Sequence, residues 1–215
     1  MAGASWSRGR AIRDATQKQQ SISSFFSPRL LDEPKAEAAK RDVPLRVMFQ
    51  DEARFGRITE PYACWAPPGF RPDVPSQIIR EYTYLYGVVS PKDGKADFLI
   101  LPAMDGECMN VFLAELSQRY ADEYLAIFWD GAPCHQPGAI IIPDNIWLEK
   151  LPPRCPDLNP QENIWDDMRE SFFANLLFDS MQAVELQLIT AANFYEANPS
   201  RVQSITAWDW IVSML

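Results

Sequence analysis

The sequence predicts an α/β protein in which a mixed β-sheet is flanked by α-helices. Short runs rich in aromatic and β-branched residues recur along the chain and are bounded by turn residues, as strands are. Segments with apolar residues at helical spacing lie between and after these runs. The resulting order, with strands and a hairpin first and helices last, is typical of a sheet covered by helices.

The ordered part is expected to begin near Pro44. Strands are predicted at residues 45–49, 55–65, 82–90, 96–101, 124–129 and 145–151, the third and fourth being joined as a hairpin by a turn at 91–94. A PPGFRP loop at 67–72 closes off the second strand. Helices are predicted at residues 110–120, 162–178 and 180–196, with a short one within 205–214.

The stretch LPPRCPDLNPQENIW, residues 151–165, organises the second half of the chain. Asn159 is a good N-cap, Pro160 suits the first helical position, and Glu162 falls in the first turn. The helix is anchored by apolar residues at helical spacing, namely Ile164, Trp165, Met168, Phe172 and Leu176. Glu162 is therefore held rigidly, either as a cap that accepts from the Asn159 N–H or as a functional carboxylate.

The charge of the chain is unevenly placed. The net charge is −9. Residues 1–42 hold eight basic and five acidic residues, and the remainder holds twelve basic and twenty-four acidic ones. Such an acidic body would not bind a polyanion strongly without metal ions or added basic parts.

The cysteines and the apolar runs bear on the compartment. The four cysteines form no Cys-x-x-Cys pair, which favours free thiols over a zinc site or disulfides. No apolar run approaches the ~18 residues of a membrane helix, and the N-terminus lacks the apolar core of a signal peptide. We therefore expect a soluble, cytoplasmic protein without a membrane partner.

Residues 1–43 are polar and basic, so we expect a disordered tail or linker with at most transient helix. Within it, QQSISSFF, from Gln19 to Phe26, resembles peptides that dock on sliding clamps. Such a peptide plugs one aliphatic and two aromatic anchors into a groove. The alternative is that Phe25 and Phe26 dock the tail onto the domain.

Three acidic residues share one kind of position. Asp51 follows the first predicted strand, Asp130 follows the buried strand at 124–129, and Glu162 opens a helix after the last strand. The C-terminal strand ends of an open α/β sheet lie along one edge, where sites gather. Converging carboxylates repel one another unless cations neutralise them, and hard oxygen ligands suit Mg²⁺ or Mn²⁺.

Two such ions would activate a water or a 3′-hydroxyl for attack on a phosphodiester. Taken singly, each residue has a structural alternative. Asp51 fits a strand-end turn, and Asp130-Gly131 is a common turn dipeptide.

Three blocks together resemble the DDE transposases of bacterial insertion sequences, in the six-hundred-and-thirty branch of the mariner superfamily. The blocks read FQDEARFG at 49–56, IFWDGAPCH at 127–135 and LPPRCPDLNPQENIW at 151–165. The first ends an apolar strand in Asp-Glu, and the second places a His shortly after its Asp. The third carries Leu-Asn-Pro-x-Glu and a Trp three residues on. The family usually has a Lys seven residues after that Glu, where this chain has Arg169.

The resemblance implies an RNase H-like catalytic domain over residues 44–215, including the C-terminal helices. It implies a catalytic and metal-binding triad of Asp51, Asp130 and Glu162 with two ions, Mg²⁺ or Mn²⁺. The implied protein is a DDE superfamily endonuclease that cleaves and joins transposon-end DNA during transposition of a mobile element, a form of DNA recombination. DNA binding would place it on the nucleoid, and the resemblance leaves room for a homodimer.

One departure concerns the DNA-binding part. Family members carry helix-turn-helix modules ahead of the catalytic domain, and residues 1–42 are too short and too polar to hold them. We expect the catalytic half alone, with the helix-turn-helix segment missing from this chain. The alternative is a truncated, inactive remnant that acts at most as an interaction module.

Other residues of the blocks are accessory. His135 shapes its loop or touches the chemistry. Arg154 and Arg169 contact phosphate, or else are solvated or ion-paired. Glu52 is interpreted as a neighbour of the site and not as a ligand, and Trp165 as a core residue.

Overall fold

The computed structural model describes residues 29–59, 61–131, 140–152 and 158–214. The strands are β1 (Leu45–Ile58), β2 (Ile78–Ser90), β3 (Lys95–Leu101), β4 (Tyr124–Trp129) and β5 (Ile146–Lys150). The helices are α2 (Asp32–Arg41), α3 (Gly106–Arg119), α4 (Gln161–Met168), the π-helical turn η2 (Arg169–Phe173), α5 (Met181–Ala197), α6 (Pro199–Thr206) and α7 (Asp209–Met214).

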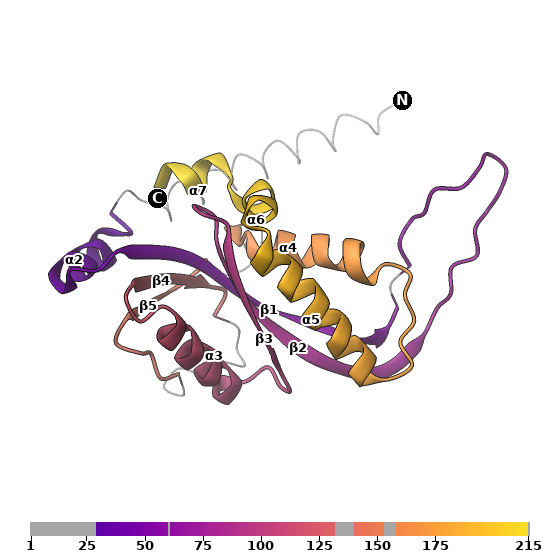
Figure 1. The fold of residues 1–215 in the computed structure, drawn as a ribbon, viewed down its shortest axis with the longest axis horizontal. Coiled ribbons are helices and arrows are strands. Elements are labelled where there is room, and N and C mark those ends of the chain that lie inside the picture. Colours follow the sequence, from indigo (N-terminus) through magenta and orange to yellow (C-terminus); the bar gives the residue numbers. More distant parts are fainter. Residues whose placement is uncertain (1–28, 60, 132–139, 153–157, 215) are drawn as a thin grey trace, which may run out of the picture.

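The strands form one five-stranded sheet in the order β3-β2-β1-β4-β5 (Figure 1). The hairpin strands β1, β2 and β3 pair antiparallel, whereas β4 and β5 pair parallel to β1 and to each other. The parallel ladder between β1 and β4 ends at the pair Phe49–Phe128. The antiparallel ladder between β1 and β2 continues to Ile58. The predicted mixed sheet is therefore confirmed, and the second half of β1 has a described strand partner on its β2 side only.

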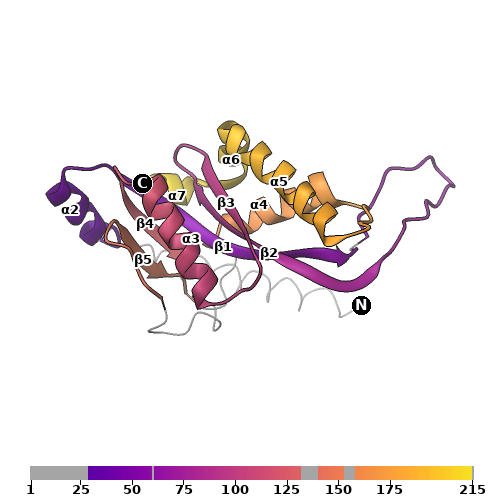
Figure 2. The ribbon, with the colours of Figure 1, turned by 60° about the horizontal axis from the view of Figure 1, so that its bottom comes forward.

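Helices cover both faces of the sheet, with α3 on one face and α4, α5 and α6 on the other (Figures 1 and 2). Alternate residues of each central strand point to opposite faces, so each strand contributes to two cores. The core under α3 includes Met48, Tyr86, Phe112, Leu116 and Ile127. The core under α4 and α5 includes Phe49, Phe128, Trp165, Leu188 and Tyr195.

Strand β1 differs from the prediction of a short strand at 45–49 and a second one at 55–65. Asp51 and Glu52 do not end the strand, because their backbones remain in the ladder with β2. In that ladder Asp51 lies opposite Gly87 and Glu52 opposite Tyr86. Asp51 therefore lies in the middle of β1, and the expected position after a strand end is wrong.

The expected tail contains α2, so the expectation of at most transient helix is wrong for residues 32–41. Acidic residues in its first turn and basic residues in its last turn complement the helix dipole. Leu31 and Ala38 are buried, and the helix lies against β4 and β1. The clamp-like stretch from Gln19 to Phe26 lies outside the described residues.

The helix predicted at 162–178 is shorter and irregular. Helix α4 ends at Met168 and continues as the π-helical turn η2 to Phe173. Asn175 then has a left-handed backbone with φ 58°, which stops the helix. Leu176, expected on the apolar face, is 44% exposed.

The remaining elements agree with the prediction to within a few residues at their ends. They include the hairpin of β2 and β3, the buried strand β4, the last strand β5, and helices α3 and α5. The short helix expected within 205–214 is present as α7, and α6 before it was not predicted. Among the described residues, no helix is both long and apolar enough to cross a bilayer.

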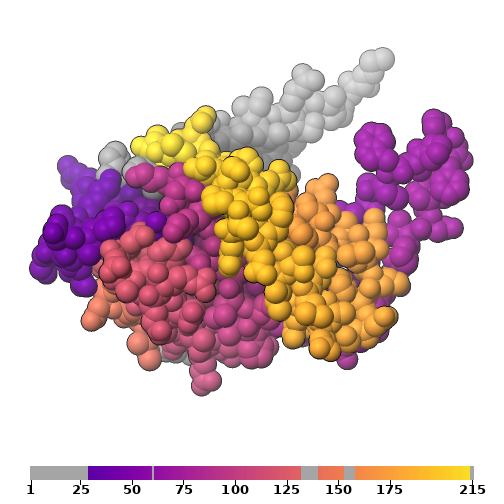
Figure 3. Space-filling model, viewed as in Figure 1, coloured from indigo at the N-terminus to yellow at the C-terminus, as the bar shows by residue number. Residues whose placement is uncertain are grey.

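The chain between β1 and β2 stands apart from the body, as Figure 3 shows in purple. It has no helix or strand over residues 61–77. The predicted PPGFRP loop at 67–72 lies within this segment, and the strand expected up to residue 65 is absent. Trp65 is fully exposed and Phe70 is 65% exposed.

Helix α4 packs tightly on the sheet at Gly87. A Cβ added to Gly87 would lie 2.4 Å from Cη2 of Trp165 and 2.7 Å from Nε2 of Gln161. Both distances are far below van der Waals contact, so only glycine leaves room for these two α4 side chains. Since Gly87 lies opposite Asp51 in the β1–β2 ladder, this contact places α4 directly over Asp51.

Replacement of Gly87 by alanine is expected to lower the free energy of unfolding by about 1–3 kcal/mol, the usual cost of overpacking a core. In a Trp165→Phe background the same change should cost at least about 1 kcal/mol less, because the smaller ring removes the closest contact. Urea unfolding of the two single variants and the double variant measures both quantities. An equal cost of Gly87→Ala in both backgrounds would show that Trp165 is not what the glycine accommodates.

Candidate active site

Asp51 is a buried carboxylate held by helix α4. It lies on the face of β1 that carries Phe49 and Ala53, and it is 6% exposed. The indole Nε1 of Trp165 donates a hydrogen bond to Oδ2 of Asp51 at 2.9 Å. Trp165 is itself buried, so its packing fixes the direction of the Asp51 carboxylate. The expectation that Trp165 is a core residue is confirmed, and the residue also orients the site.

Asp130 reaches the same level as Asp51 because of the strand register. Phe49 and Phe128 are paired in the parallel ladder, so two residues further along each strand Asp51 and Asp130 stand side by side. Gly131 follows with φ 63°, a left-handed conformation that lets the chain turn away directly after Asp130. Asp130 is exposed, unlike Asp51.

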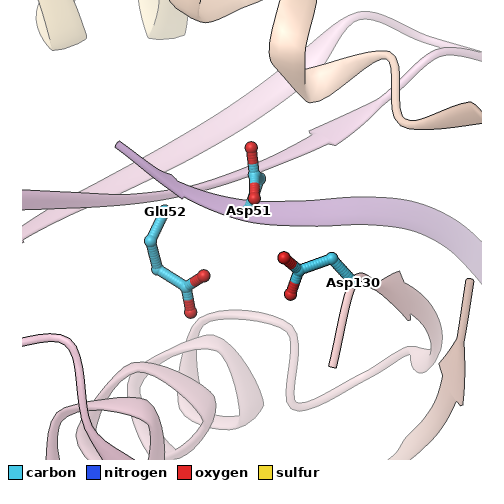
Figure 4. Close-up of side chains that lie close together, drawn as sticks. All are labelled: Asp51, Glu52 and Asp130. Carbon is cyan, nitrogen blue, oxygen red and sulfur yellow. The ribbon is translucent and has the colours of Figure 1, made fainter. Parts of the chain in front are cut away.

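Three carboxylates converge where β4 ends beside β1. One oxygen from each of Asp51, Glu52 and Asp130 lies within 4.8 Å of the other two. Figure 4 shows the Asp130 carboxylate reaching back from the end of β4 toward β1, where it faces Asp51 and Glu52. The group combines one buried, one half-buried and one exposed acid.

Glu162 is presented by the start of α4, which is tied to β1. The Asn159 side chain donates from Nδ2 to the carbonyl of Gln50 at 2.9 Å, and its Oδ1 accepts from the backbone N–H of Gln161 at 3.1 Å. Asn159 therefore accepts from the first N–H of α4, but the N-cap position is Pro160, one residue later than predicted, and the helix begins at Gln161. Among the described residues, no hydrogen bond engages the Glu162 carboxylate, so the capping alternative for Glu162 finds no support.

Electrostatic repulsion links these groups. Burial raises the pKa of the Asp51 carboxyl well above its ordinary range. The negative charges of Glu162, Glu52 and Asp130 raise it further, in that order. The hydrogen bond from Trp165 acts in the opposite direction. Glu162 therefore lies within electrostatic reach of Asp51, although it is outside the group of three.

The pKa of Glu162 is also raised, chiefly by burial. The charge of Arg169 opposes this, and the charges of Asp166 and Asp130 add to it. A site with this much uncompensated negative charge favours binding of divalent cations through oxygen ligands.

Comparison with known proteins identifies the family. A family model described as DDE superfamily endonuclease matches residues 46–185, well over half of the chain. The chain belongs to the DDE superfamily endonuclease family. A curated relative, the uncharacterized protein y4pE/y4sA of Sinorhizobium fredii, is 35% identical over 130 residues, covering 60% of this chain and 96% of its own length.

Solved structures show which fold this DDE endonuclease chain has. The Mos1 transposase paired-end complex with the left transposon end matches with a TM-score of 0.57 and 17% identity over 91% of this chain. The catalytic domain of Mos1 mariner transposase matches with a TM-score of 0.50 and 13% identity, covering 92% of each chain. Further Mos1 paired-end complexes with Mn and with Mg match at TM-scores of 0.55 and 0.52. The predicted RNase H-like fold is therefore confirmed, while the chain spans 60% of the length of the full Mos1 chain.

The predicted site residues of this DDE endonuclease differ in how closely they approach one another. It brings Asp51 and Asp130 together and sets Glu162 near them, so the triad remains a prediction that the geometry supports. Glu52, which the sequence analysis set aside, joins the group. Strand alternation predicts that Glu52 points to the opposite face of the sheet from Asp51, so the sequence gives no reason to place it in the site. Nor does the sequence carry a signal that β4 stops pairing with β1 at Phe49.

Of the three predicted accessory residues, only Arg169 lies within the described residues. Arg169 lies with its guanidinium 5.3 Å from the centre of the Phe55 ring and pairs with the exposed Asp166 at 3.7 Å. Its charge acts on Glu162, so it is close to the site. His135 and Arg154 lie outside the described residues.

Asp51→Asn is expected to stabilise the DDE endonuclease chain in EDTA at pH 8 by roughly 1–2 kcal/mol, or about 3–6 °C in Tm. The change removes a buried charge and its repulsions. Because the folded-state pKa of Asp51 is raised, its favourable contribution is present at low pH and is lost as pH rises through that pKa. The advantage of the variant should therefore shrink toward pH 5. Thermal melts at both pH values decide the matter, and a variant less stable than wild type at pH 8 would contradict the argument.

Proposed function

We propose that this chain is the catalytic domain of a transposase that cleaves DNA at transposon ends and joins it to a target. The observation that supports this most directly is the convergence of Asp51 and Asp130 at the end of the β1–β4 ladder, with Glu162 within electrostatic reach. The proposed catalytic and metal-binding residues are these three. The proposed unit covers residues 44–215, with α2 packed against β4 and β1.

The residues fit two divalent ions, Mg²⁺ or Mn²⁺. All donors are carboxylate oxygens, and the most buried of them, Asp51, is 6% exposed and surrounded by like charges. Solved Mos1 complexes contain Mn or Mg, which agrees with this donor set. When bound, such ions polarise a phosphodiester and lower the pKa of an attacking water or 3′-hydroxyl.

Neighbouring side chains hold the proposed catalytic carboxylates in place. Trp165 holds the Asp51 carboxylate in one direction, and Asn159 ties the start of α4 to β1 so that Glu162 keeps a fixed height over the sheet. Arg169 brings a positive charge to the side of Glu162. It also lines, together with Arg54, a pocket of about 90 Å³ whose other walls include Phe55, Tyr62 and Phe173. Two arginines beside an acidic site suit the phosphates of a bound DNA strand.

The proposal also names the partners and the location of the chain. The Mos1 structures include paired-end and strand-transfer complexes, which supports transposon-end and target DNA as partners here. A helix-turn-helix segment supplied by another polypeptide, a homodimer, and a location in the cytoplasm on the nucleoid complete the proposal. The sliding-clamp motif from Gln19 to Phe26 stays a prediction.

Incubation of supercoiled plasmid with the full chain and Mn²⁺ tests the proposed function. Wild type should nick the plasmid, and Asp130→Ala and Glu162→Gln should reduce the rate about a hundredfold or more, the usual loss when a transition-state charge loses its stabiliser. Glu107→Gln, on the exposed first turn of α3, removes the same charge away from the site and serves as the matched control.

Melting curves in EDTA should show that all variants are folded. Equal nicking by wild type, Asp130→Ala and Glu162→Gln would refute catalysis at this site. It would then favour the remnant that acts only as an interaction module.

A further inference from the structure

We propose that Glu52 is a direct ligand of a divalent ion shared with Asp51 and Asp130. The inference rests on the proposed function, since it concerns the same acidic site, and it adds a residue outside the predicted triad. Glu52 thus brings a carboxylate to the ion from the α3 side of β1, opposite the side on which α4 presents Glu162.

The geometry of β1 makes this arrangement unusual. Consecutive strand residues point to opposite faces, so Asp51 and Glu52 should diverge. Asp51 does face α4 through Trp165, and Glu52 lies opposite Tyr86, a residue of the core under α3. Their carboxylate oxygens nevertheless come within 4.8 Å of each other and of Asp130. Both side chains must therefore bend toward the open edge that β1 has beyond Phe49, where β4 no longer pairs with it.

The size of the group suits one ion. Octahedral Mg²⁺ holds oxygens at about 2.1 Å, so ligands on opposite sides of it are about 4.2 Å apart. The oxygens of Asp51, Glu52 and Asp130 span at most 4.8 Å, which small side-chain rotations convert to that distance. Figure 4 shows the Asp130 carboxylate turned toward the other two, with the three carboxylates at the corners of a triangle.

A buried amide beside the group gives independent support. Gln50 is 0% exposed, and among the described residues neither its Oε1 nor its Nε2 has a hydrogen-bond partner. Two residues before Glu52 on one strand, it lies on the same face of β1, next to the end of β4. An unsatisfied buried amide costs about 1–3 kcal/mol. Mg²⁺ keeps several of its waters when bound, and such waters on the α3 side would satisfy this amide.

Two polar groups near Glu52, the Tyr86 hydroxyl and the N-terminus of α3, are hydrogen-bonded to other partners. Its cross-strand neighbour Tyr86 donates its hydroxyl proton to the carbonyl of Ala103 at 3.0 Å, so that proton is not offered to Glu52. The nearby start of α3 is capped by Asp105, whose Oδ1 accepts from the N–H of Cys108 at 2.9 Å. The Tyr86 hydroxyl proton and the α3 cap are therefore both engaged by groups other than Glu52.

Titration of the full chain with Mn²⁺ in the absence of DNA tests the inference, with free Mn²⁺ followed by electron paramagnetic resonance. Glu52→Gln should weaken Mn²⁺ binding at least about tenfold, as loss of a group that supports a metal does. Glu107→Gln, which removes the same charge from the exposed first turn of α3, should change the affinity less than about twofold. Asp51→Asn should also lose binding.

A further variant separates coordination from charge attraction. Glu52→Asp keeps the charge and shortens the side chain by one methylene, so its affinity should fall between those of wild type and Glu52→Gln. Wild-type affinity in Glu52→Asp together with a tenfold loss in Glu52→Gln would mean attraction at a distance and would overturn the inference. Melts in EDTA establish that each variant is folded.

The remaining outcomes distinguish the two proposals. If Glu52→Gln binds Mn²⁺ as Glu107→Gln does while Asp51→Asn loses binding, Glu52 is no ligand and the proposed function stands. If wild type binds no Mn²⁺, both proposals fail together.

Discussion

The structure depends on where strand β4 stops pairing with β1. Up to Phe49 the two strands share a parallel ladder, and beyond it β2 is the only strand in the described part of the chain that pairs with β1. This end of the ladder opens an edge in the middle of a long central strand. Asp51 on β1 and Asp130 after β4 meet there, because the register carries them to the same level. If β4 went on pairing with β1 beyond Phe49, the sheet itself would separate Asp51 and Glu52, which start from opposite faces.

Helix α4 is adapted to this edge by several contacts that depend on one another. Trp165 can approach the sheet this closely only because residue 87 has no side chain, and from that position its indole N–H reaches Asp51. Asn159 donates to the carbonyl of Gln50, one residue before Asp51. The residue just before α4 and Trp165, one turn into the helix, are therefore both bound to the same short part of β1. The stretch LPPRCPDLNPQENIW therefore encodes the attachment of the helix as well as the carboxylate of Glu162.

The sequence supports a good prediction of the elements whose pattern is local. The hairpin, the buried strand β4 and the helix α5 need only alternation, turn residues and helical spacing. Prediction from the sequence fails where strand pairing sets the length of an element. Asp51 and Glu52 look like a strand end because they are polar, but β1 continues to pair with β2 there, opposite Gly87 and Tyr86. The approach of Asp51, Asp130 and Glu162 could be predicted from topology and family resemblance. The place of Glu52 could not, because it follows from an interrupted ladder.

The energetic cost of the acidic site argues against an inactive remnant that only retains the fold. Asp51 is buried among like charges, and the two polar side-chain atoms of Gln50 beside it find no hydrogen-bond partner in the segments that the structure describes. Both features lower the stability of the metal-free fold, and neither is needed for packing, since Val88 and Gly87 opposite them are apolar. A fold tolerates such local costs where a ligand offsets them, and local rules of stability are most often broken at functional sites. Binding of a divalent cation would then offset these costs, which links the stability of this sheet edge to its chemistry.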